Sequence, residues 1–361
     1  MADEKPKIEE QDTSSPIEEL QKRMEDIEMS LGVFNPRNLG GLRTKDLQQA
    51  TRANLFGDGS DGDVVVSTSI NLTRDMFYNN LTVESGGIIN TKSFRIFVKD
   101  QFIKKPGGIL KNNGNNGANG NTTTGGAGGV AVASGSLPGG IAGGDGGRGG
   151  NTGSYGEPGD DGTDASKSLG SAGSGGGGGG NGSSGFGYSA SAGGDGGSQT
   201  GTVFNIINSF FSAYYLIDIL PSIVALTISA GSGGGGGGGS STTHRTSGGG
   251  AGSTGGLIWI AANRMFIEGT DEIQCDSGNG GNGVDGNDGN PAEGGGGGGA
   301  GGSGGVIILI YGEKTGTGTL SVDKGAGGTG GTGGTGVYED GHPGSPGTAG
   351  TTGKTYNIQI Q

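Results

Sequence analysis

The chain has 361 residues, of which 93 are glycine and only 29% are apolar, and its formal net charge is −13. Proteins usually contain about 7% glycine, so a hydrophobic core can include only part of this chain. The negative charge argues against a nucleic-acid partner, which requires a basic face. One cysteine and two histidines argue against a disulfide framework and a Cys/His metal site, and we expect no cofactor.

The N-terminal region predicts one helix between two irregular stretches. Residues 1–15 are polar and acidic, contain no apolar signal sequence, and are expected to be disordered. A helix is expected over 16–34, because Pro16 suits the first turn and Ser15 with Glu18 forms a capping box. Residues 35–56 are expected to form a connector. The apolar seam of the helix has coiled-coil spacing and comprises Ile17, Leu20, Met24, Ile27 and Leu31.

This seam has two interpretations. It contains about two and a half heptads, which are too few for an isolated stable helix. Either the helix packs on its own domain, or it serves in oligomerisation or docking. In the second case we expect a homotrimer.

Residues 57–112 predict a strand-rich module, because short β-branched runs alternate with turn residues. The acidic run at its start, "DGSDGD", offers Asp58, Asp61 and Asp63 as oxygen ligands for Ca²⁺. It lacks EF-hand spacing, so an Asp/Gly turn is the preferred interpretation. The expected strands are Val64–Val66, Ile70–Leu72, Leu81–Val83, Ile88–Ile89, Phe94–Val98 and Ile109–Leu110.

A strand pattern recurs at 93–120, at 256–283 and, more loosely, at 305–331. Each copy has a buried strand, a second strand, a turn, a short third strand and an exit into glycine. Trp259 lies in a strand of the second copy and is expected in the core. A recurring unit with long insertions at one corner predicts a mainly β fold of the β-helix or solenoid type.

Residues 113–361 predict a glycine-rich domain with interleaved strands. Some tracts have glycine at every third position, as in 144–162 and 325–334, whereas others are all glycine, as in 175–180 and 294–299. A period of three matches the polyproline II helix, and glycine edges let such helices stack closely. We expect all-glycine runs at the centre of a stack and period-three runs outside. Flexible linkers and a collagen-like triple helix are the alternatives.

The apolar segment 203–230 is long enough to span a bilayer. Asn205, Asn208, Asp218 and Pro221 interrupt it, and no basic flank orients it. We therefore expect a buried core segment and no membrane insertion.

No catalytic site is predicted, and the chain is not expected to be an enzyme. The two histidines lie in glycine-rich loops, which gives no convincing Ser-His-Asp arrangement. Asp271, Glu272 and Asp276 lie near a strand edge, where paired carboxylates can cleave polysaccharide. Solvated turn carboxylates are the preferred interpretation.

The stretch "GDGSDGDVVVSTSINLTRDMFYNNLTVESGGIINTKSFRIFVKD" resembles the strand module of glycine-rich virion and tail-fibre proteins of bacteriophages. The strand-plus-glycine units at 255–283 and 304–331 resemble the same proteins. The polyglycine tracts are similar to those of the tip adhesins on long tail fibres of T-even-like phages. The resemblance covers 57–361 and implies stacked polyglycine helices whose connecting loops bind a bacterial receptor.

The function that this resemblance implies is that of a virion structural protein, most simply a tail fibre or receptor-binding adhesin. Its partners would be a bacterial surface protein or glycan and other virion tail proteins, and its location the phage virion. A non-adhesive decoration or surface-layer protein is the alternative. Aromatic residues among glycines suit binding loops; the other interpretation is that they cap the glycine stack. The predicted receptor-binding residues are Tyr155, Phe186, Tyr188 and Tyr338.

Overall fold

The computed structural model describes residues 55–137, 139–149, 178–180, 246–270, 272–289 and 292–360. The chain divides into two compact units, Met1–Asn54 and Leu55–Gln361, and all described residues belong to the second. The predicted helix 16–34, with its five seam residues, and the apolar segment 203–230 lie outside the described residues.

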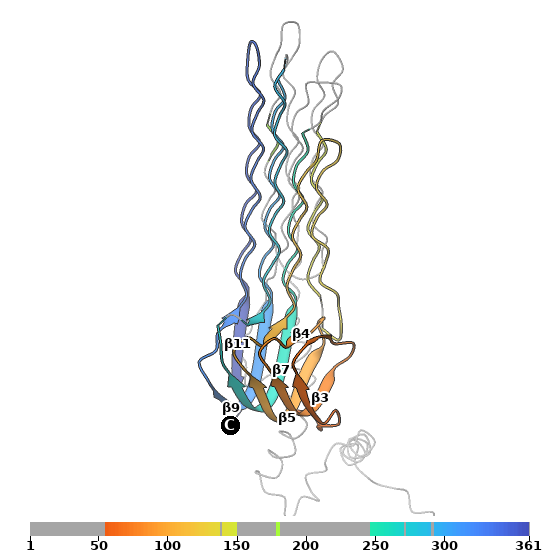
Figure 1. The fold of residues 1–361 in the computed structure, drawn as a ribbon, viewed down its shortest axis with the longest axis vertical. Helices are drawn as coiled ribbons and strands as arrows, with labels where there is room; N and C mark the ends of the chain where they lie inside the picture. Colours follow the sequence, from red (N-terminus) through yellow and green to blue (C-terminus); the bar gives the residue numbers. More distant parts are fainter. Residues whose placement is uncertain are drawn as a thin grey trace, which may run out of the picture. The chain divides into compact units, whose positions relative to one another are not determined.

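The described part of the second unit consists mainly of strands in two open parallel sheets (Figure 1), which confirms the mainly β prediction. The odd-numbered strands form one sheet and the even-numbered strands the other. Between two neighbouring strands of one sheet, the chain therefore forms a strand of the other sheet. The six-stranded sheet has the order β1 (Asp63–Val66), β3 (Met76–Val83), β5 (Arg95–Lys104), β7 (Leu257–Ile267), β9 (Val306–Thr315) and β11 (Lys354–Gln359). The five-stranded sheet has the order β10 (Leu320–Ser321), β8 (Ile273–Gln274), β6 (Ile109–Lys111), β4 (Ile88–Asn90) and β2 (Ser69–Asn71).

All six strands expected in 57–112 are present, but the two leading strands predicted in each repeat are one long strand. In the first repeat this is β5, which continues through the polar pair Lys99 and Asp100. A register shift between Val98 and Gln101 interrupts its pairing with β7. A bulge of this kind bends a strand without ending it, so the polar pair does not form a turn. Strands from 57–112 and from 113–361 share both sheets.

Apolar side chains pack on both faces of the six-stranded sheet because successive residues of a strand point to opposite faces. Between the sheets, Leu81, Ile96 and Ile260 pack with residues of the smaller sheet such as Ile89 and Leu110. A second cluster on the other face contains Phe97, Trp259, Ile308, Leu137 and Ile141. Trp259 is therefore a core residue, as the sequence predicts.

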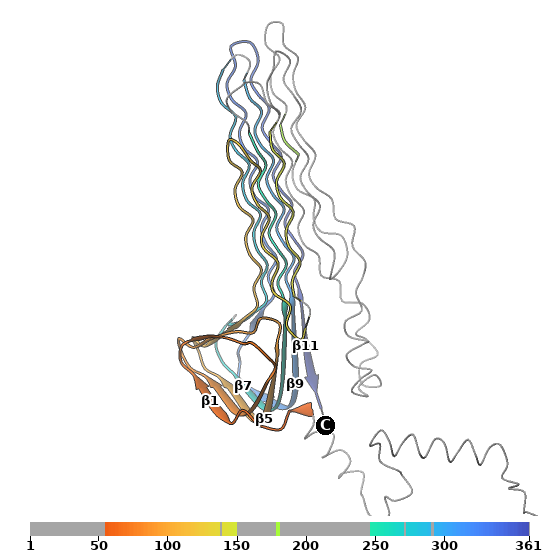
Figure 2. The same ribbon diagram turned by 90° about the vertical axis from the view of Figure 1, so that its right-hand side faces the viewer.

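Glycine-rich arms leave one end of the sheets and run side by side (Figure 1 and Figure 2). Strands β6, β8 and β10 lead into arms, and arms lead back into β7, β9 and β11. We name the arms in chain order: arm A (112–121), arm B (124–134), arm C (139–149), arm D (246–256), arm E (275–289), arm F (292–305), arm G (322–336) and arm H (341–353).

Hydrogen bonds join the arms with a period of three, as arm D illustrates. The amide of Gly248 donates to Gly147 O in arm C, that of Gly249 to Gly297 O in arm F, and that of Gly250 to Ala118 O in arm A, each at 2.9 Å. The next residues repeat this order, beginning with Ala251 and Gly144 O. Three residues per turn place each successive amide on a different edge, so one arm is bonded in three directions.

Burial separates inner arms from outer arms. Every residue of arms D and F is buried, including the all-glycine run 294–299. In arm G, Gly328, Gly331 and Gly334 are buried, whereas the intervening Thr329 and Thr332 are exposed. The described arms are thus a hydrogen-bonded lattice in which the all-glycine run 294–299 lies inside and the period-three arm G lies outside, and they are not flexible linkers.

Candidate functional site

The described ends of arms E and G lie side by side, because Gly289 of arm E forms a parallel bridge with Gly336 of arm G. Arm G continues through the loop 336–340 into arm H. This loop is closed by the amide of Gly336, which donates to Asp340 Oδ1 at 2.9 Å. Below it, the amide of Gly341 donates to Gly334 O at 2.8 Å. The lattice therefore fixes both ends of the loop 336–340.

This loop presents the one predicted receptor-binding residue that the structure describes. Tyr338 is 68% exposed and the adjacent Val337 is 73% exposed. Val337 was not predicted from the sequence as a binding residue. Its apolar side chain, next to a tyrosine in a glycine tract, could have indicated an exposed apolar loop. Tyr155, Phe186 and Tyr188 lie outside the described residues.

Side-chain amides and carboxylates form a ladder across arms A, E and G. In arm A, Asn116 Oδ1 accepts the amide of Asn279 at 2.8 Å, and Asn279 Oδ1 in turn accepts the amide of Ala326 in arm G at 2.8 Å. The same relay passes from Asn119 through Asn282 to Thr329. The acceptors in arm E are Asp276, Asn279, Asn282, Asp285 and Asp288.

The ladder supplements the backbone lattice on its outer side. Each acceptor stands three residues after the previous one, so all project from the same edge. The sequence shows this spacing in "DSGNGGNGVDGND", but it does not show which amides the side chains reach. Asn and Asp are placed there because their short side chains carry an acceptor close to the backbone.

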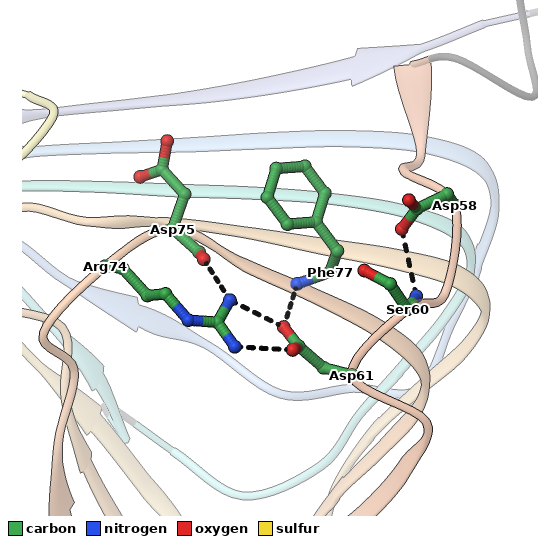
Figure 3. Close-up of polar contacts among 6 residues, drawn as sticks. All are labelled: Asp58, Ser60, Asp61, Arg74, Asp75 and Phe77. Atoms are coloured by element: carbon green, nitrogen blue, oxygen red, sulfur yellow. Dashed lines mark hydrogen bonds and ion pairs between the residues drawn. The ribbon is translucent and has the colours of Figure 1, made fainter.

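The acidic run before β1 is an Asp/Gly turn whose carboxylates bind protein groups (Figure 3). Asp61 accepts Arg74 Nη2 at 2.6 Å and Nη1 at 3.1 Å, and its Oδ2 also accepts the amide of Phe77 at 2.7 Å. Asp58 Oδ1 accepts the amide of Ser60 at 2.9 Å. Within the described residues, no group of three or more His, Cys, Asp or Glu side chains is placed to hold a metal ion.

These contacts stabilise the ionised form of each carboxyl group. The Arg74 hydrogen bond is the largest cause that lowers the pKa of Asp61. The Ser60 amide lowers the pKa of Asp58, and the Asn79 and Asn80 side chains lower that of Asp63. The run therefore anchors the start of the sheet to β3.

A second anchor joins β5 to the loop between arms B and C. Asp75 accepts the amide of Arg95 at 2.8 Å and Arg95 Nε at 2.7 Å, and it also accepts the hydroxyl of Ser136. Burial raises the pKa of Asp75, but the hydrogen bonds from Arg95 and Ser136 outweigh it and the net shift is downward. The Asp75 carboxylate thus connects the segment before β3 with β5 and with the loop between arms B and C.

Two of the three carboxylates predicted near β8 are described, and both are partly exposed and bind protein groups. Asp276 Oδ1 accepts the Ser321 hydroxyl at 2.5 Å and the amide of Asp323 at 2.8 Å. Glu272 Oε1 accepts the amide of Gly107 at 2.6 Å, and Glu272 Oε2 contacts Lys104 Nζ. Asp271 lies outside the described residues.

Comparison of the chain with protein-family models, curated proteins and solved structures found no match. Among the described residues, no helix is long and apolar enough to cross a membrane. The structural observations that bear on function are therefore the exposed loop 336–340 and the lattice that holds it.

Proposed function

We propose that this protein is a structural component of a phage virion, a tail fibre or receptor-binding adhesin that contacts the bacterial surface through loops on a polyglycine scaffold. The observation that carries the proposal is the exposure of Val337 and Tyr338 at the end of bonded arms. The sequence resemblance over 57–361 supports it. The proposed receptor is a surface protein or glycan, and the proposed location is the virion.

The scaffold would combine two regular architectures. Alternation of strands between two parallel sheets supports a β-solenoid in which each coil contributes one strand to each sheet. The three-directional hydrogen bonds of arm D and its burial support stacked polyglycine II helices. Such a stack satisfies backbone groups that isolated helices leave to water.

A rigid support suits recognition because it limits the entropy lost on binding. Tyr338 brings a large amphipathic surface with few rotatable bonds. The bonds of Gly336 to Asp340 and of Gly341 to Gly334 hold the loop before a ligand arrives. Preorganisation of this kind improves affinity without new contacts.

Binding of the purified full-length protein to isolated envelopes from a panel of bacteria tests the proposal. On a host that binds, Tyr338→Ala is expected to weaken binding by about tenfold or more, as truncation of an aromatic anchor does. Thr122→Ala, in the exposed turn between arms A and B, is the control and should bind normally. The corresponding changes at Tyr155, Phe186 and Tyr188 test the remaining predicted residues.

The outcomes separate the two functional alternatives. Full binding by a variant with alanine at all four aromatic positions would show that the loop assignment is wrong. Absence of binding to every envelope, with the protein folded, would favour a non-adhesive decoration or surface-layer role.

Sedimentation of the full chain with and without Leu20→Asp tests the proposed trimeric N-terminus, because a charge in a coiled-coil seam dissociates the helices.

A further inference from the structure

A lysine occupies a position in the apolar interior between the two sheets. Lys104 ends β5 and is paired in register with Val83 of β3 and Ile267 of β7, both buried apolar residues. Val83 is itself paired with the buried Val66. The Lys104 side chain is 0% exposed. A buried ammonium is unfavourable unless a partner neutralises it.

The partner comes from the turn before β8, which is far away in sequence. Lys104 Nζ contacts Glu272 Oε2, and it also donates to the backbone carbonyl of Glu268. The other carboxylate oxygen, Glu272 Oε1, accepts the amide of Gly107 at 2.6 Å. The two oxygens of one carboxyl group therefore have different partners, an amine on one side and a backbone amide on the other.

A glycine provides the space for this carboxyl group. A Cβ atom on Gly269 would lie 2.0 Å from Glu272 Oε2, 2.6 Å from its Cδ and 2.9 Å from Lys104 Nζ. Gly269 also has a φ of +84°, which side-chain-bearing residues rarely adopt. Any other residue at 269 would displace the carboxyl group from the amine.

We propose that Lys104 and Glu272 are the site of a self-catalysed covalent cross-link, an amide bond between Lys104 Nζ and Glu272 Cδ. This would be a modification of the folded chain and does not depend on the proposed receptor-binding function. An amine held in contact with a carboxyl group reacts as an intramolecular nucleophile, and such proximity replaces activation by a separate enzyme.

The reaction balances without any co-reactant. The ammonium of Lys104 passes one proton to Glu272 Oε2, which leaves a neutral amine and a neutral carboxylic acid. The amine lone pair attacks Cδ and forms the new N–C bond, while negative charge moves to Oε1. A proton then passes from nitrogen to Oε2, the Cδ–Oε2 bond breaks, and Oε2 leaves as one molecule of water.

The surroundings favour each stage of this reaction. Burial lowers the pKa of Lys104 to about 8, although the charge of Glu268 opposes the shift, so the neutral amine is accessible near neutral pH. The Gly107 amide already bonds Oε1, the atom that becomes the oxyanion, and a preorganised donor there stabilises the transition state. The Glu272 side chain is 19% exposed, which gives the released water a route to solvent.

The product would connect two distant segments of the chain covalently. The bond would join the end of β5 to the turn before β8 and close a loop that contains arms A to D. A cross-link that closes a long loop restricts the unfolded chain. It would also replace the buried charge of Lys104 and the partly buried charge of Glu272 by a neutral amide, which removes their desolvation penalty.

Mass spectrometry of the purified full-length protein tests the proposal directly. The intact chain is expected to be lighter than its sequence by one water, and a tryptic digest should contain the peptides of Lys104 and Glu272 joined together. Lys104→Met and Gly269→Ala should both restore the full mass and separate the peptides. Lys105→Met is the matched control, because Lys105 forms an exposed pair with Glu84 at 2.8 Å and its loss should leave the cross-link intact.

Two results would overturn the proposal, and both come from the wild-type protein, so they do not depend on whether a variant folds. The first is a full mass with separate peptides, which would make the contact an ion pair only. The second is a missing water with separate peptides, because aspartyl-glycine sequences such as Asp58-Gly59 can also lose water. Glu272→Gln adds a positive check, since the same amide would form with release of ammonia.

Discussion

A Cβ atom on Gly299 would lie 2.1 Å from the carbonyl oxygen of Gly250, because the backbones of arms F and D are in direct contact. Gly299→Ala must therefore separate two buried arms, and we expect a loss of about 3 kcal/mol or more in the free energy of unfolding. Thr329→Ala is the control, because its exposed side chain lies on the outside of arm G. Chemical denaturation of both variants measures the difference, and equal stability would contradict the lattice.

The side-chain ladder predicts a smaller loss at Asn282. Asn282→Ala removes the acceptor of the Thr329 amide, which lies 2.9 Å from Oδ1. The expected destabilisation is about 1 kcal/mol, the usual net value of one hydrogen bond. Thr329→Ala keeps the backbone amide and should have little effect. Faster hydrogen exchange of the Thr329 amide in Asn282→Ala alone would be the local signature.

The two Arg–Asp pairs of β5 and β7 are expected to differ in strength. Arg95→Met breaks a pair whose side chains are mostly buried and which also holds Ser136 through Asp75. Its expected loss is about 1–3 kcal/mol. Arg264→Met breaks an exposed pair with Asp100 and should change stability by less than about 1 kcal/mol. Thermal unfolding of the two variants tests this order, and the reverse order would refute it.

Acid should weaken the anchor at Asp61. The hydrogen bond from Arg74 lowers the pKa of Asp61 below its usual value of about 3.9, so the contribution of Asp61 to stability is complete above that pH. The contribution is lost as pH falls through the lower folded-state pKa. Asp61→Asn and Arg74→Met should each reduce the loss of stability between about pH 5 and about pH 2. An unchanged acid dependence in both variants would show that the anchor is not coupled to folding.

The strands and the glycine arms were largely predictable because each follows from a local period. Short β-branched runs identified all six strands of 57–112, and the three-residue glycine period identified segments that form arms, such as 325–334. The length of β5 was not predictable in this way. Lys99 and Asp100 have the polarity of a turn, and only the bulge after Val98 shows that the strand continues.

The candidate sites were less predictable because they depend on contacts between distant residues. Tyr338 could be identified from its isolation among glycines. Lys104, in contrast, stands beside Lys105 in "IKKPGG", and the sequence gives no reason to distinguish the buried lysine from the exposed one. The register of β5 between β3 and β7 makes that distinction.

The sequence by itself determined that the chain alternates β-strands with period-three glycine segments, because backbone periodicity is a property of neighbouring residues. Only the tertiary structure decided which arms are central, which amides the Asn and Asp ladder reaches, and that Glu272 meets Lys104. Those outcomes depend on how β-strands and arms align across long insertions. Alignment of that kind is settled by packing between segments, and no local pattern encodes it.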